Sequence, residues 1–307
     1  MKTTLYVQDI ECDSCVRLIE RTLKRLQGIN EYAVKKDRVV IDYDPSLVKA
    51  ETISEAITLN GYRTSTYPLA RVSYKQRWRD FTANRRKYWV EWRMLAYIMA
   101  SLLFLLAIDG TLYLIFFQGE TGFLNHYWQW LLYLDITVVT IGAALWHLKA
   151  YKGAVTSMTG MMLGMTLGMQ AGFMVGAVVG ATNGMFTGSM TGMGAGILLG
   201  AYAGKESGIM GAMQGMMSGL MGGTMGAMVT VMLLADHVAI FMPFFMAINV
   251  LILWAMSYMV YEEIVEEKRV RVAPADFSLF FSYVFVFALL IGIIMVYGPK
   301  SLLVAIQ

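Results

Sequence analysis

Cys12 and Cys15 are the only cysteines in the chain, and two residues separate them. Cysteines this close are poorly placed for an ordinary structural disulfide, so the spacing indicates a metal site or a redox pair. Two thiolates on a short loop suit a soft metal with near-linear ligation, which favours Cu(I) over the alternatives Ag(I), Zn and Hg(II). A thioredoxin-type redox pair normally needs a longer domain and a cis-proline, and this region offers only Pro45 and Pro68. We therefore expect a metal site.

Methionine supplies a second set of soft sulfur atoms. Of the 25 methionines, 17 lie between Met158 and Met232. Two rows with a spacing of four residues are formed by Met161, Met165 and Met169, and by Met213, Met217, Met221 and Met225. The thioether is a neutral ligand for Cu(I) or Ag(I) that adds no charge to desolvate in a membrane. The alternative is that methionine, an adaptable side chain, only fills gaps beside glycine.

Polar side chains inside otherwise apolar segments are further candidates for a metal pathway. They are Asp135, Gln170 and Gln214, and His237 of a predicted outer loop is a further candidate. An ionisable group within a membrane span is expected to be functional, although Asp135 could instead pair with a polar neighbour. Other polar residues are expected to gather at the outer face, namely Asp109, Glu120, His126 and Asp236, together with His237. The sequence predicts no catalytic residues, and we expect no enzymatic activity.

The cysteine pair lies within a predicted small α+β domain. Alternating apolar residues predict strands at 3–9, 30–35, 38–43 and 62–67. Val16, Ile19 and Leu23 have helical spacing in a segment that Gly28 ends, and a second helix is expected at 49–59. This order predicts a ferredoxin-like βαββαβ sandwich over residues 1–68. The cysteines fall in the loop before the first helix, where the helix dipole favours a thiolate.

The residues around the cysteines carry a family resemblance. The segment Asp9-Ile10-Glu11-Cys12-Asp13-Ser14-Cys15 is similar to the GMxCxxC motif, with Asp and Ile in place of Gly and Met. Residues 3–67 thus resemble a heavy-metal-associated domain, the module of bacterial copper chaperones and of the N-terminal extensions of copper-pumping P-type ATPases. The resemblance implies a ferredoxin-like fold with Cu(I) on Cys12 and Cys15. It also implies that Ile10 fills the core beneath the loop and that Tyr62 shields the metal.

The remainder of the chain has the composition of a membrane protein. Hydrophobic residues make up 57% of the sequence and charged residues 15%, and most of the charge lies in residues 1–93. The basic, tryptophan-rich linker 69–93 is typical of a membrane-interface anchor rather than a nucleic-acid patch. The all-α transmembrane domain, 94–307, is expected to contain about seven helices. The predicted spans are 94–117, 127–148, 156–180, 184–203, 208–234, 238–261 and 277–297.

The distribution of positive charge predicts the orientation of these spans. No apolar signal segment precedes the first strand, so we expect the N-terminal domain in the cytoplasm of a cell with this protein in its plasma (inner) membrane. Lys149, Lys152 and Lys205 fall in predicted inner loops, as do the basic residues of 268–271. The predicted outer loops at 118–126, 181–183 and 236–237 have no Lys or Arg.

Glycine recurs at every fourth position from Gly160 to Gly208. A single helix through this run would be about 73 Å long, roughly twice the membrane thickness, so breaks are expected at 182–184 and 204–208. Small residues at this spacing let helices approach closely in lipid. The glycines expected to pack over the Gly- and Met-rich core 156–234 are Gly160, Gly164, Gly168, Gly172, Gly176, Gly211, Gly215 and Gly219.

These features favour a transporter that passes Cu(I) along the methionine rows and exchanges it with Cys12 and Cys15. The alternatives are a non-transporting metal-binding scaffold or sensor, and a mercury-uptake protein, which would normally have cysteines in its helices. An ATP-driven pump is excluded because the sequence has no DKTGT segment, no Walker loop and no membrane CPC motif. The expected partners are the metal ion, the lipid bilayer, a copper chaperone or copper ATPase, and further copies in a homo-oligomer; nucleic acid is not expected.

Overall fold

The protein divides into two compact units, Met1–Asn84 and Arg85–Gln307, which are described separately. The computed structural model describes residues 2–7, 13–26, 28–35, 38–45, 47–58, 64–65, 67, 89–117, 123–150, 157–234, 236–265 and 276–301. Most of the predicted linker 69–93 therefore lies outside the described residues.

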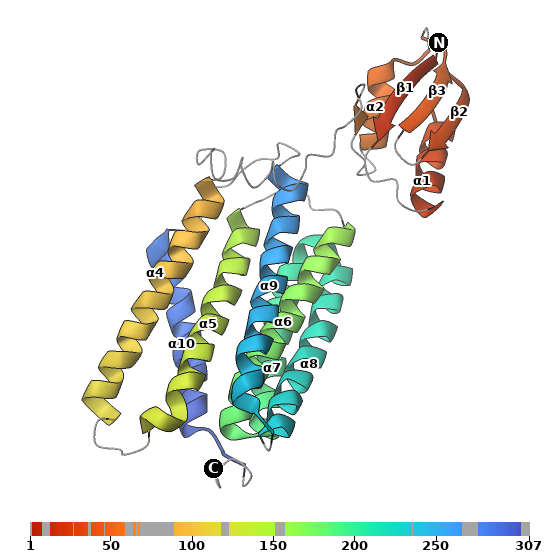
Figure 1. The fold of residues 1–307 in the computed structure, drawn as a ribbon. Coiled ribbons are helices and arrows are strands. Elements are labelled where there is room, and N and C mark those ends of the chain that lie inside the picture. The colour runs from red at the N-terminus through yellow and green to blue at the C-terminus, as the bar shows by residue number, and fades with distance from the viewer. Residues whose placement is uncertain are drawn as a thin grey trace. The chain divides into compact units, whose positions relative to one another are not determined.

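The first unit is a four-stranded antiparallel sheet with two helices (Figure 1). Its elements are β1 Lys2–Val7, α1 Asp13–Lys24, β2 Ile29–Lys35, β3 Arg38–Tyr43, α2 Ala50–Thr58 and β4 Thr64–Ser65. The strand order is β2-β3-β1-β4, so β1 lies between its two partners in the middle of the sheet. This arrangement confirms the predicted ferredoxin-like fold.

One hydrophobic core holds the sheet and both helices together. Leu5 of β1 and Ile41 of β3 are buried against Ile19 of α1 and Ile53 of α2. Each comes from the apolar side of its own element, as the strand alternation and helical spacing require. The helices are therefore fixed on one face of the sheet, and the position of the start of α1 follows from that packing.

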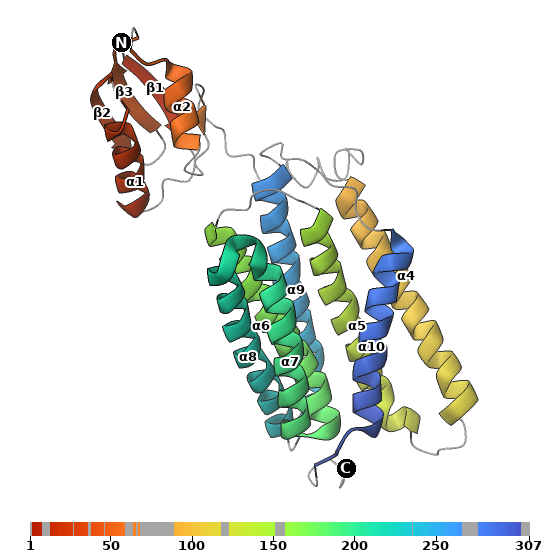
Figure 2. The same ribbon diagram turned by 180° about the vertical axis from the view of Figure 1, so that it is seen from behind.

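The second unit is a bundle of long helices that lie side by side (Figures 1 and 2). The helices are α4 Trp89–Leu112, continued by the π-helix Tyr113–Phe117, α5 Phe123–Ala150, α6 Ser157–Asn183, α7 Met185–Gly204, α8 Gly208–Leu233, α9 Val238–Val265 and α10 Phe277–Tyr297. Six of them are long and apolar enough to span a membrane, and α7 is not among the six. The chain is thus a multi-pass membrane protein.

Two helices, α7 and α4, differ from the predicted spans. The segment 184–203, expected to be a seventh span, forms α7, a 20-residue helix that is not among the six long and apolar enough to span a membrane. Helix α4 begins at Trp89 rather than at 94, which brings Trp92 and Arg93 into its first turns. The guanidinium of Arg93 lies over the rings of Trp89 and Tyr97, and this contact extends the helix at its polar end.

Helices α6, α7 and α8 form a three-helix unit in which each helix contacts the other two. The chain turns at Gly184, with φ 101°, and at Gly208, with φ 78°, both within the segments where breaks were predicted. Positive φ is strained for residues with a Cβ, so glycine allows these two sharp reversals. A 3-10 turn, Lys205–Ser207, completes the second reversal.

The three helices meet through their backbones. At each of the eight glycines expected to pack, an added Cβ would come within 3.0 Å of another part of the chain, and at all but Gly160 the nearest atom belongs to another helix backbone. At Gly172, for example, it would lie 2.6 Å from the amide nitrogen of Gly223. Contacts this close leave no room for a side chain between the helices.

Helix α5 connects this three-helix unit to the rest of the bundle. It packs against α6 and α9 on one side and against α4 and α10 on the other (Figure 2). These contacts use large side chains, including Val138, Trp146 and Phe280, which are buried in one continuous hydrophobic core. The bundle therefore combines a glycine-packed half with a conventionally packed half.

Replacing Gly172 with Ala should destabilise the membrane unit, because the new methyl group would meet backbone atoms of α8 that cannot rotate away. We expect the free energy of unfolding to fall by about 1–3 kcal/mol. Gly194→Ala is the matched control in α7, since nothing lies within 4 Å of its Cβ position. This control should be neutral or stabilising by up to about 1 kcal/mol. Thermal unfolding in detergent measures both, and equal midpoints for the two variants would contradict the backbone packing.

Candidate metal centre

The cysteine site lies at the start of α1. Cys15 is in the first turn of that helix, while Cys12 and the loop 8–12 lie outside the described residues. The loop is anchored at both ends, because Val7 of β1 and Ile19 of α1 are each about 1% exposed in the domain core. The free N–H groups of the first helical turn favour negative charge, which suits thiolate ligands.

Two further predictions for this site fall outside the described residues. Ile10, expected beneath the loop, and Tyr62, expected to shield the metal, both belong to segments that the structure does not describe. Within the described residues, the chain returns to this end of the sheet, because Thr64 of β4 pairs with Val7 of β1. The hydroxyl groups of Ser54 and Thr64, 2.5 Å apart, tie α2 to β4.

The methionine rows lie on the outer surface of the three-helix unit. On α8, Met213, Met217, Met221 and Met225 are between 40% and 63% exposed. On α6, Met165 is 41% exposed, and Met161 and Met169 are half-buried. The glycines take up the inner faces of both helices, and the methionines of these rows lie away from those faces.

One contact joins the two rows. The side-chain amide of Gln214 on α8 donates a hydrogen bond to Sδ of Met165 on α6, with the atoms 3.5 Å apart. This contact places a sulfur atom of the α6 row beside the α8 row. We use the term α6–α8 seam for the outer surface formed by Met161, Met165 and Met169 of α6 and by Gln214, Met217, Met221 and Met225 of α8.

The other predicted pathway residues do not join the seam through any contact that the described part of the chain shows. Gln170 is buried within α6, and its Oε1 has no hydrogen-bond partner. His237 is highly exposed in the turn before α9, where its Nε2 lies 3.8 Å from a carboxylate oxygen of Asp236. Asp135 lies in α5, and it interacts with Asp109 of α4. Glu120 and the side chain of His126 are outside the described residues.

Two acidic residues have surroundings that the sequence interpretation did not foresee. Asp109, expected at the outer face, is half-buried near the end of α4 and lines a cavity beside Asp135. Glu91 lies 4.0 Å from His147 across the same two helices, both largely buried. A signal was present, because Asp109 and Asp135 are equidistant from Gly122 in a predicted helical hairpin. Residues placed in this way lie at the same depth when two helices are antiparallel, and the packing of the helices decides whether they meet.

The ligand set favours a soft metal. Within the described ranges there is no group of three or more His, Cys, Asp or Glu side chains that could hold a metal ion. The sulfur atoms are the abundant donors, as thiols in the first unit and thioethers on α6 and α8. Sulfur donors select Cu(I) and related soft ions rather than Mg²⁺ or Ca²⁺.

Comparison with known proteins identifies the first unit. Residues 4–63 match the heavy-metal-associated domain. The chain belongs to this family through its N-terminal domain. It is 34% identical over 65 residues to the copper chaperone CopZ of Enterococcus hirae, covering 94% of that protein and 20% of this chain. It is 36% identical over 58 residues to the copper chaperone CopZ of Staphylococcus haemolyticus, covering 85% of that protein and 18% of this chain. No solved structure matches the chain.

The heavy-metal-associated domain accounts for the cysteine pair and for the fold around it. The match ends at residue 63, before the first membrane helix, so it gives no information on the helices. The heavy-metal-binding part of the protein is thus a small domain of about a fifth of the chain, attached to a much larger membrane bundle.

Cys12→Ser and Cys15→Ser should each weaken Cu(I) binding by the fragment 1–84 at least about tenfold, because only one of the two thiolate ligands remains. Competition with a chromogenic Cu(I) chelator measures this affinity. Ser14→Ala, between the two cysteines, is the matched control and should bind as the unmodified fragment does. Unchanged affinity in either cysteine variant would contradict a two-thiolate site.

Proposed function

We propose that this protein is a Cu(I) transporter of the plasma (inner) membrane, without enzymatic activity, whose N-terminal domain exchanges the metal in the cytoplasm. The observation that carries the proposal is the joining of a heavy-metal-associated domain, similar to copper chaperones, to a multi-pass bundle with methionine rows. Thiolates bind Cu(I) more strongly than thioethers do, so transfer from the membrane rows to Cys12 and Cys15 is favourable without ATP.

The packing of the glycines restricts the route of the metal. Cu(I) cannot pass between α6, α7 and α8, because backbone atoms of these helices already lie too close to admit even a Cβ at positions such as Gly168 and Gly196. The sulfur atoms are instead available along the α6–α8 seam. Successive sulfur atoms along a helical row are about 6 Å apart, which suits stepwise ligand exchange.

A metal-binding scaffold without transport is the second candidate, and a specific observation supports it. The methionines of the α8 row are exposed on the outside of the bundle, where lipid or another protein would cover them. In that case the sulfurs only pack, and the membrane unit anchors the heavy-metal-associated domain near a partner such as a copper chaperone or copper ATPase. Flux measurements separate the two candidates.

Replacing Met161, Met165 and Met169 together with Leu, or Met217, Met221 and Met225 together with Leu, should lower Cu(I) flux into proteoliposomes severalfold. Leucine has a similar volume, so each substitution should cost less than about 1.5 kcal/mol and leave the protein folded. The matched control replaces Met185 and Met190 with Leu. These residues are exposed on α7, outside the seam, so the control should retain full flux. Wild-type flux in both triple variants would favour the scaffold.

The proposed orientation places Lys205 inside the cell and His237 outside, and both are exposed at turns of the bundle. Single cysteines at these positions, in a background without Cys12 and Cys15, should react differently with a membrane-impermeant maleimide on intact cells. We expect labelling at 237 and none at 205 until the cells are permeabilised. The reverse pattern would invert the topology and place the N-terminal domain outside.

A further inference from the structure

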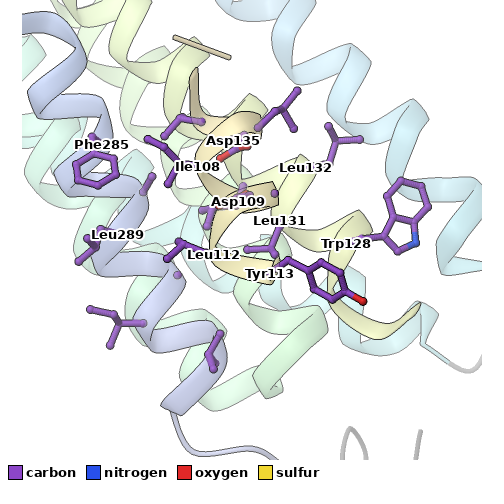
Figure 3. Close-up of a pocket in the computed structure, with 18 of the residues that line it drawn as sticks. Ile108, Asp109, Leu112, Tyr113, Trp128, Leu131, Leu132, Asp135, Phe285 and Leu289 are labelled. Atoms are coloured by element: carbon purple, nitrogen blue, oxygen red, sulfur yellow. The ribbon is translucent and has the colours of Figure 1, made fainter. Parts of the chain in front are cut away.

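Helices α4, α5 and α10 surround a cavity of about 910 Å³ (Figure 3). Most of its wall is made of leucine, isoleucine and other apolar side chains, such as Leu131 and Leu289. Asp109 and Asp135 are the two acidic residues among those that line it. An apolar cavity with a small number of converging polar groups is the usual form of a binding site.

The two carboxyl groups come from different helices and meet in this cavity. Asp109 of α4 interacts directly with Asp135 of α5, and the labelled side chains lie together in Figure 3. Asp135 is only 2% exposed, and its Oδ2 has no hydrogen-bond partner. A buried carboxylate oxygen without a donor is unstable, so this arrangement needs a positively charged or proton-donating ligand.

No side chain from the surrounding helices supplies that charge. None of the described residues that line the cavity is Lys, Arg or His, and the other titratable groups there are the phenols Tyr113 and Tyr297. Helix α6, behind α5, has no ionisable residue. The pair Glu91 and His147 lies about 27 Å away along α4, at 1.5 Å for each of the intervening residues.

The cavity extends toward one end of the helices that line it. Tyr113, Trp128 and Tyr297 line the cavity, and they lie near the end of α4, the start of α5 and the end of α10. Trp128 and Tyr297 are at least half exposed. Tyrosine and tryptophan concentrate at the interface between lipid and water, so this end of the cavity is where a small ligand enters from the aqueous phase.

We propose that Asp109 and Asp135 form a proton-binding site in which the two carboxyl groups share one proton. Two carboxylates in contact within an apolar wall repel each other and are poorly solvated, and a single proton removes one charge and donates a hydrogen bond between them. The pair does not suit Mg²⁺ or Ca²⁺, which need six or more oxygen ligands, or Cu(I), which prefers sulfur. The assignment holds whether or not the chain transports copper.

Dicyclohexylcarbodiimide tests this proposal on the full-length protein in liposomes, because this apolar reagent reacts with protonated carboxyl groups within membranes. We expect labelling of Asp109 or Asp135 at neutral pH, located by mass spectrometry of the peptides. Asp135→Asn and Asp109→Asn, alone and combined, should remove the label from the substituted residues, and the double variant should show none in α4 or α5. Asp236, which is exposed at a helix end, is the internal control and should stay unlabelled.

Two outcomes would overturn the assignment. Absence of label on both Asp109 and Asp135 in the unmodified protein, with the reagent active on a membrane protein of known reactivity, would show that no carboxyl group in the cavity is protonated. Protection by NaCl, but not by KCl at equal concentration, would assign the site to a sodium ion instead. Size-exclusion chromatography of each variant shows whether it is folded. If the double variant is not folded, the loss of label from the substituted residue in either single variant serves as the comparison.

Discussion

Backbone contact between α6, α7 and α8 constrains the rest of the membrane unit. Gly172 and Gly176 of α6 approach the backbone of α8 at Gly223, and Gly192 of α7 approaches both neighbouring helices. In lipid there is little hydrophobic driving force between helices, so close van der Waals contact of this kind is a main source of association. The same contact excludes side chains from the centre of the three-helix unit. It therefore decides both the stability of the unit and the places where ligands can lie.

The positions of the methionines follow from this constraint. Because glycine occupies the inner faces, the thioethers of α8 are displaced to its outer face, and Met165 meets Gln214 only at the edge between two helices. The proposed metal route would consequently follow a surface seam rather than a central pore. Such a seam needs a cover of lipid or protein, which connects the question of transport with that of self-association.

The other half of the bundle packs in a different way and has a different chemistry. Helices α4, α5 and α10 have large side chains at their contacts, among them Tyr97, which stacks on Phe280 and meets the ring of Trp146 edge to face. Large side chains hold the helix axes apart, and a cavity lined by Asp109 and Asp135 lies between them. The methionine rows and the pair of carboxyl groups thus lie on different helices of the membrane unit.

The sequence by itself determined the local features. The alternation in 2–7 and 38–43 and the helical spacing of Val16, Ile19 and Leu23 were readable, because each depends on residues close together in the chain. The cysteines were expected in the loop before the first helix, and Cys15 lies in the first turn of that helix. The turns at Gly184 and Gly208 were also predictable, because a helix longer than the membrane thickness must break.

Only the tertiary structure decided which faces meet. A glycine row that advances about 40° per step winds around its helix, so the sequence predicted that the glycines pack but could not show which surface of α6 and α8 the methionines occupy. Likewise Asp109 and Asp135 are on separate helices, and their encounter depends on how α4 and α5 pack. The orientation of one helix about its axis is set by contacts with its neighbours, which periodicity along one segment does not contain.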